Sequence, residues 1–317
     1  MNELVITRHN EMIDPHLSIW GWEIPVYLFL GGLVAGMMII SGYFILTGRT
    51  KNTLCSCFRI PVIGIVAISL GMFALFLDLE HKLYVWNLYI NFKWQSPMSW
   101  GAWILIFIYP ILILGILIRI PDEIGQRFPK LLGLSNKLRN KQQFVKLLGA
   151  LSMIFGGLLG AYTAVLLSAF SARPAWNSPM LWTLFLASGL SSAAALVHLI
   201  GKDPAERHML AKADNGFLIA ELIIIILMII GFVSSSQVHI DAARLILSGP
   251  FTAVFWVFVV FIGIIIPFII QILSVNNKIP HTNVAPILVM IGGLILRFIV
   301  VYAGQYSHWS RNVFIGY

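Results

Sequence analysis

Charged residues are scarce in this sequence of 317 residues. Asp, Glu, Lys and Arg make up only 11% of it, whereas hydrophobic residues make up 59%. A soluble domain carries about 25% charged residues, because its surface must stay hydrated. So little charge, together with a mean hydropathy of +0.88, excludes an ordinary soluble domain and indicates that lipid is the main solvent of the protein.

Ligands for redox metals are also scarce. The two cysteines, Cys55 and Cys57, cannot supply the four thiolates that an iron–sulfur cluster needs. Of the eight histidines, only His198 lies clearly within an apolar run, and His81 lies at the edge of another. A membrane cytochrome b needs histidines that face each other across one haem iron. We therefore expect no haem, no iron–sulfur cluster and no other metal site in this protein.

Eight apolar runs are long enough to cross a bilayer. A helix needs about 20 apolar residues to cross roughly 30 Å of hydrocarbon, and none of these runs shows the period of two that marks a barrel strand. The sequence predicts an all-α integral membrane protein, a bundle of about eight transmembrane helices in a single membrane domain over residues 1–317. The predicted spans are 22–46, 60–79, 100–117, 147–170, 180–200, 217–234, 251–273 and 284–303.

The basic residues indicate how the bundle is oriented. The net charge is +8, but the basic residues fall between apolar runs rather than on a polar surface patch, so we expect no nucleic acid partner. Most of them lie in the loops that follow the first, third, fifth and seventh spans. Cytoplasmic loops retain Lys and Arg. We therefore expect both termini on the outer, periplasmic side of a bacterial inner (cytoplasmic) membrane, crossed many times by the protein.

Polar side chains within the apolar runs are few, and each needs a partner or a function. Most fall in the outer half of the predicted bundle, where acidic, imidazole, phenolic and guanidinium groups around an apolar cavity would suit a quinone. The ring oxygens of a quinone need hydrogen-bond donors, and oxidation of the quinol needs proton acceptors. These outer residues are Glu23, Tyr27, Asp78, His81, Tyr162, Arg173, Arg297 and Tyr302.

Two readings stay open for several of these residues. Glu23, Asp78 and Arg297 could instead form interfacial or buried ion pairs that fix the register of the helices. His198 and Glu221 lie toward the cytoplasmic ends of the fifth and sixth spans. They could begin a proton path from that side, or they could be a satisfied pair at the helix ends.

Several segments resemble the NrfD and polysulfide reductase membrane-subunit family, in the family's order and over most of the sequence. SPMSWG and the stretch 162–195 are the most specific of them. The segments are WGWEIPVYLFLGGLVAG (20–36), LDLEHK (77–82), SPMSWGAWIL (96–105), YTAVLLSAFSARPAWNSPMLWTLFLASGLSSAAA (162–195) and GGLILRFIVVYAGQ (292–305).

The resemblance implies a membrane-anchor subunit of a respiratory oxidoreductase complex, which performs no complete reaction alone. Such a subunit exchanges electrons with the menaquinone or ubiquinone pool, and we expect it to act as a quinol dehydrogenase that oxidises menaquinol. The resemblance also implies a four-iron four-sulfur, ferredoxin-like partner on the outer face. Beyond that partner it implies a catalytic subunit, either a molybdopterin enzyme or a multihaem cytochrome c.

The resemblance carries over to particular residues. Tyr162 corresponds to the tyrosine that opens the family's YT motif, and Glu23 and Tyr27 occupy the first-span positions where relatives can carry Asn and His. Glu23 is the first candidate for the catalytic proton acceptor, with Asp78 and His81 after it. Tyr27 and Tyr162, with Arg173, are expected to bind the quinone. The family's LDL-G-R-P pattern is altered here, because the residues at 80–82 are EHK.

Two other functional classes compete with this reading. A secondary transporter would show internal repeats and helices broken near the middle of the membrane. We find no convincing repeat between the halves of the sequence, and Pro267 is the main residue that would break a span. A purely structural anchor, without contact to a quinone, is the third possibility.

Overall fold

The computed structural model describes residues 20–49, 56–121, 126–169, 173–276, 278–280 and 282–308. All regular secondary structure in these ranges is helical, and eight helices are long and apolar enough to cross a membrane. This confirms the predicted all-α membrane fold. The spans are α1 (Glu23–Leu46), α2 (Arg59–Asp78), α4 (Pro97–Leu117), α7 (Gln142–Ser168), α8 (Leu181–Ile200), α9 (Pro204–Val233), η4 (Val254–Ile265) continued by α11 (Ile266–Val275), and α12 (Val284–Tyr306).

The sixth span differs most from its predicted bounds. It begins at Pro204 rather than at residue 217, so its first turns are polar. Asp203 caps this helix by accepting a hydrogen bond from the backbone N–H of Ala205, and Pro204 takes the first helical position, where its missing N–H costs nothing. The longer helix carries Asp214 into the bundle, where its side chain is 1% exposed.

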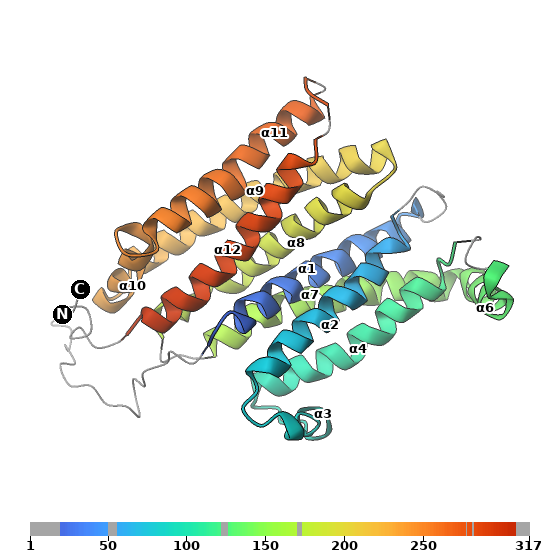
Figure 1. The fold of residues 1–317 in the computed structure, drawn as a ribbon, viewed down its shortest axis with the longest axis horizontal. Helices are drawn as coiled ribbons and strands as arrows, with labels where there is room; N and C mark the ends of the chain where they lie inside the picture. Colours follow the sequence, from blue (N-terminus) through green and yellow to red (C-terminus); the bar gives the residue numbers. More distant parts are fainter. Residues whose placement is uncertain are drawn as a thin grey trace.

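The helices fall into two groups around α1 (Figure 1). Helices α2, α4 and α7 pack on one side of it, and α8, α9, η4–α11 and α12 form the other group. Helix α1 itself contacts α2, α7, α8 and α12. Close approach of α1 and α8 depends on glycine, because a side chain at Gly36 or Gly189 would overlap the backbone of the facing helix.

The seventh span changes geometry halfway. Its first part, η4, is a π-helix, and α11 continues it with Pro267 near its start. Proline has no N–H, so it leaves the carbonyl four residues earlier without its usual helical donor. That carbonyl belongs to Gly263, which lies against Gly292 of α12. Pro267 therefore marks a real discontinuity, as the sequence predicted.

Helix α1 begins and α12 ends at the same end of the bundle, which we call the outer end (Figure 1). There the backbone of Trp20 and the side-chain amide of Gln305 exchange two hydrogen bonds, of 3.2 and 3.0 Å. The Trp20 ring also stacks on Trp176, with centroids 5.1 Å apart. These contacts join the first and last described segments over one apolar cluster. Assignment of the outer end to the periplasm stays a prediction.

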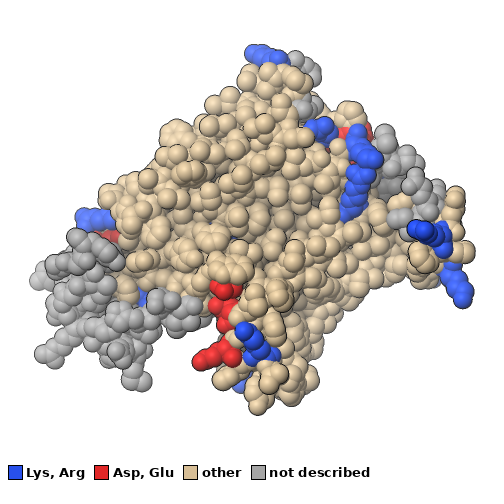
Figure 2. Space-filling model, viewed as in Figure 1, with Lys and Arg blue, Asp and Glu red and all other residues tan. Residues whose placement is uncertain are grey.

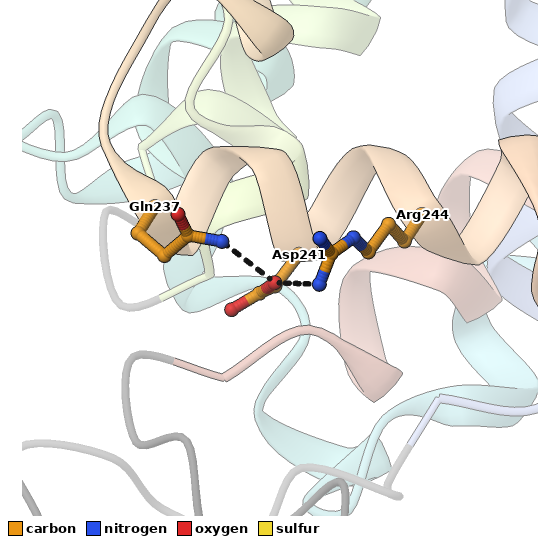
Figure 3. Close-up of polar contacts among 3 residues, drawn as sticks. All are labelled: Gln237, Asp241 and Arg244. Atoms are coloured by element: carbon orange, nitrogen blue, oxygen red, sulfur yellow. Dashed lines mark hydrogen bonds and ion pairs between the residues drawn. The ribbon is translucent and has the colours of Figure 1, made fainter.

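Short helices lie in the connections between spans. They are η2 (Lys82–Tyr84), α3 (Asn87–Ile90), α6 (Pro129–Arg139), η3 (Pro174–Trp176) and α10 (Gln237–Leu247). In α10, Asp241 accepts hydrogen bonds from Gln237 at 3.3 Å and from Arg244 at 3.0 Å (Figure 3). These partners are four and three residues away, and so lie on one face of the helix. Arg244 is largely exposed, so the ion pair contributes little to stability.

Candidate functional site

Two buried tyrosines form the centre of the outer-end cluster. Tyr27 comes from α1 and Tyr162 from α7, and they are 1% and 7% exposed. Their hydroxyl groups lie close enough to interact electrostatically, and buried hydroxyl groups need a polar partner. The surrounding side chains are apolar, among them Leu28, Leu167 and Phe185. The structure thus brings together two of the three residues that were predicted to bind a quinone.

Gly101 of α4 makes the position of Tyr162 possible. The phenol end of Tyr162 lies where a side chain on residue 101 would begin, so any larger residue there would overlap the ring and its hydroxyl. Gly101 is the glycine of the SPMSWG motif. That motif is one of the segments that resemble the family. The contact with Tyr162 explains in physical terms why this position of the motif holds a glycine.

A third tyrosine approaches this pair. Tyr89 of α3 is half-buried and interacts electrostatically with both Tyr27 and Tyr162. Burial, and then the nearby hydroxyl of Tyr109, raise the pKa of Tyr89, so its hydroxyl keeps its proton at neutral pH. The Tyr109 hydroxyl lies 3.1 Å from that of Ser69. Sequence reasoning missed Tyr89 because it lies in a connection that hydropathy cannot place.

Two carboxylates lie above the tyrosines at the outer rim. Glu23 is in the first turn of α1, and Asp78 is the last residue of α2. Both are half-buried, and they are close enough to interact electrostatically. Glu23 precedes Tyr27 by four residues, which puts it on the same helix face and about 6 Å further out. Figure 2 shows acidic side chains gathered beside the lobe that contains α3, near the start of α1.

His81 and Arg173 have different surroundings. His81 is exposed, and its ring packs edge-on against Tyr84 with centroids 6.5 Å apart. The buried guanidinium of Arg173 donates to the Ser307 carbonyl at 2.9 Å and lies 2.7 Å from Nδ1 of His308. These contacts of Arg173 fasten the α7–α8 connection to the end of α12. Among the described hydrogen bonds, none joins Arg173 to either tyrosine.

The two residues proposed for a proton path are both buried but have different partners. Glu221 of α9 interacts with Ser188 of α8 and with Arg297 of α12. His198 lies in the last turn of α8 and is 3% exposed. Arg297 was noted from the sequence, whereas Asp214, which interacts with Glu221, was not, because it falls before the predicted start of its span.

Comparison with known proteins identifies the family. The family described as "Polysulphide reductase, NrfD" matches residues 8–307. The chain belongs to this family. It is 32% identical over 304 residues to a protein named NrfD homolog from Haemophilus influenzae, which covers 90% of this sequence and 94% of that protein. It is 28% identical to protein NrfD of Escherichia coli over 305 residues, and 28% identical to the polysulfide reductase C subunit of Wolinella succinogenes over 303 residues.

The matches to these NrfD relatives cover nearly all of this sequence and nearly all of each relative. The match includes 90% of this sequence and 94 to 95% of each relative. With its eight apolar helices, this is a multi-pass membrane protein, and its family indicates a membrane subunit of respiratory oxidoreductase complexes. Within the described residues, no group of three or more His, Cys, Asp or Glu side chains gathers where it could hold a metal ion.

Proposed function

We propose that this protein is a quinol dehydrogenase anchor of a bacterial inner membrane, with the tyrosine pair as its quinone site. The observation that carries the proposal is the neighbouring pair of phenol groups of Tyr27 and Tyr162, buried in an apolar cluster at the outer end. Buried polar groups inside a membrane bundle need a structural partner or a function. Menaquinol or ubiquinol, when bound, would supply two electrons and two protons.

The pair suits a quinone because its two phenol groups lie close together in an apolar site. Each hydroxyl can donate a hydrogen bond to an oxygen of the quinone ring. Such a bond satisfies a polar group that is otherwise buried among apolar side chains. Met72, Leu75 and Ile104 pack around the cluster from α2 and α4 and are only partly buried. That flank offers an apolar route from the bilayer for an isoprenoid tail.

The rim carboxylates provide the proton acceptors. Glu23 lies about one helical turn outside Tyr27, and Asp78 lies close to Glu23. In our proposal these groups accept protons from the site and release them to the outer side. His81 is exposed three residues after Asp78, and provides the next acceptor toward solvent. Proton transfer by a positioned side chain typically contributes about 10²- to 10⁴-fold to a rate.

The outer end is also where we propose that the redox partner docks. The polysulfide reductase relative is, by its name, one part of a protein of several chains. For the present protein we propose a four-iron four-sulfur, ferredoxin-like subunit, followed by a molybdopterin or multihaem cytochrome c subunit. The connection that carries Tyr89 presents exposed Leu83, Ile90 and Trp94 at that end. We further propose that this protein holds no haem or cluster of its own.

The test is to replace Tyr162 by phenylalanine in the complex isolated from its native membrane. Losing one hydrogen bond to the substrate would cost about 1–3 kcal/mol, which corresponds to about a fivefold to 150-fold fall in quinol-linked turnover. Tyr43→Phe is the matched control, because Tyr43 is an exposed tyrosine at the other end of α1. Both variants should remain folded, and their unfolding temperatures should lie within a few degrees of the wild-type value.

Three results would contradict the proposal. Wild-type turnover in Tyr162→Phe would remove this tyrosine from the mechanism. A purified complex that contains no quinone and is not inhibited by quinone analogues would favour the structural anchor. Substrate-dependent uptake into vesicles holding this protein alone would favour the transporter.

A further inference from the structure

A second buried polar cluster lies in the other half of the bundle, apart from the tyrosine pair. Six side chains from four helices take part, and none is more than 4% exposed. We call them the inner cluster. Its members are Ser188 and Ser191 of α8, Asp214 and Glu221 of α9, Gln271 of α11, and Arg297 of α12.

Asp214 is held on both of its carboxyl oxygens. Oδ1 accepts from the Ser191 hydroxyl at 2.5 Å, and Oδ2 accepts from the Gln271 amide at 2.7 Å. These two bonds tie α9 to α8 and α11. The oxygen of the Gln271 amide is buried and has no hydrogen-bond partner. Such an orphaned acceptor costs free energy.

Glu221 continues the cluster toward the outer end. It follows Asp214 by seven residues, or two turns, so both lie on one face of α9 about 10 Å apart. Glu221 interacts with Ser188 and Arg297 as well as with Asp214. The Nε and Nη1 atoms of Arg297 are buried without hydrogen-bond partners. The two carboxyl groups and the guanidinium thus form a row of buried polar groups, and some donors and acceptors in the cluster have no hydrogen-bond partner.

Arg297 lies at the end of this row, at the edge of the proposed quinone site. Its Nη2 donates to the Phe185 carbonyl at 2.9 Å, and its guanidinium lies 4.3 Å from the centroid of the Phe185 ring. Phe185 belongs to the apolar cluster around Tyr27 and Tyr162. The guanidinium also approaches Gly32 of α1, five residues after Tyr27. The inner cluster and the tyrosine pair therefore share the wall formed by Phe185 and α1.

The charges of the inner cluster do not balance unless it holds a proton. The interactions described for the two carboxyl groups are those with each other on α9, with Arg297 of α12, with hydroxyl groups of α8 and with the Gln271 amide of α11. Further along α8, His198 is also buried. Two carboxylates against one guanidinium leave one negative charge in a buried site. An uncompensated buried charge is very costly, and one proton shared by the pair removes it.

We propose that Asp214 and Glu221 form a proton-exchanging site that is supplied from the inner side of the membrane and linked through Arg297 to the quinone site. A proton from inner-side water adds to the Asp214 carboxylate and is relayed to Glu221 by the hydroxyl groups of Ser191 and Ser188, each of which accepts one proton as it gives up another. When the proton leaves, the carboxylate is restored, and only O–H bonds form and break. The inference rests on the proposed function for its link to quinone chemistry. The inference makes Asp214 the first proton acceptor on the inner side, a role for which the sequence had indicated His198.

Infrared difference spectroscopy on the isolated complex tests the inference. Spectra are recorded between the oxidised and quinol-reduced states, in H₂O and D₂O. We expect a carboxylic acid band that shifts in D₂O and changes with the redox state. Glu221→Gln and Asp214→Asn should each remove or shift this band. Asp241→Asn, which changes an acid of α10 outside the spans, should leave it as in the wild type.

Each result has a definite meaning. If both inner-cluster variants keep the wild-type carboxyl band, the inference is overturned. Should either variant fail to assemble, Ser188→Ala keeps both acids and removes a hydroxyl that interacts with Glu221, so an unshifted band in that variant overturns it equally. If the wild type shows no quinone bands, the proposed function fails instead. The inference then stands only if the same band still titrates with pH and is lost in Asp214→Asn.

Discussion

Replacing Gly101 by alanine tests the geometry of the tyrosine pair without removing either hydroxyl. The new methyl group would occupy the space that the Tyr162 phenol fills. Either α4 must move away from α7, or Tyr162 must swing away from Tyr27. Both outcomes disturb the same site, so the substitution should affect turnover more than stability.

The magnitudes can be compared before the experiment. Alanine is favoured over glycine within a helix by about 0.5–1 kcal/mol. Overpacking a well-filled site costs about 1–3 kcal/mol, so Gly101→Ala should destabilise the bundle by about 0–2.5 kcal/mol. If Tyr162 swings away, the lost hydrogen bond to a quinone oxygen costs a further 1–3 kcal/mol or so in the transition state. That corresponds to roughly a fivefold to 150-fold loss of quinol-linked turnover.

The assay pairs this variant with a glycine that has free space around it. Gly157 lies on α7, the helix of Tyr162, and a methyl group there would meet no heavy atom within 4 Å. Gly157→Ala should therefore keep wild-type turnover and gain about 0.5–1 kcal/mol in stability. Quinol-linked turnover and thermal unfolding of the isolated complex would be measured for both variants.

A double variant separates direct contact from a general loosening of the helix. In Gly101→Ala combined with Tyr162→Phe, the ring still overlaps the new methyl group, but the hydroxyl that this overlap would displace from the site is already absent. The two costs should therefore not add, with a coupling of about 0.5 kcal/mol or more. Strict additivity, or wild-type turnover in Gly101→Ala alone, would refute the contact on which this reasoning rests.

Two further predictions concern the packing of the helices. Arg119, just past α4, donates to the Cys57 carbonyl at 2.6 Å. Burial lowers the pKa of Arg119 to about 10, so the side chain stays charged at neutral pH. Arg119→Met should lower the free energy of unfolding by about 1–3 kcal/mol, measured by thermal unfolding in detergent, and should leave turnover unchanged. Gly189→Ala should destabilise by a similar 1–3 kcal/mol or so, because a methyl group there would overlap the backbone of Gly32. Gly231→Ala is its control, since nothing lies within 4 Å of that position, and equal unfolding temperatures for the two alanine variants would contradict the prediction.

Much of the fold could be predicted because lipid leaves the backbone few choices. Helices satisfy every backbone polar group within the apolar run, so hydropathy locates the spans, and the predicted ends at residues 46, 117 and 200 coincide with those of α1, α4 and α8. The connections obey no such rule. Tyr89 reaches the tyrosine pair, and Arg173 binds the end of α12, only through the packing of segments that are far apart in the sequence.

Asp214 was not predicted as a site residue for the same reason that the start of α9 was predicted too late in the sequence. An apolar threshold cannot recognise the first three turns of this helix, which read PAERHMLAKAD, so Asp214 was assigned to a loop where a carboxylate needs no explanation. The pair Asp203–Pro204 carried the missing signal, since an N-cap acid followed by proline at the first helical position marks a helix start. Starting there, the 3.6-residue period puts Asp214 and Glu221 on one face. A carboxylate two turns from another on the buried face of a helix then needs partners, and the structure supplies them in Ser191 and Gln271.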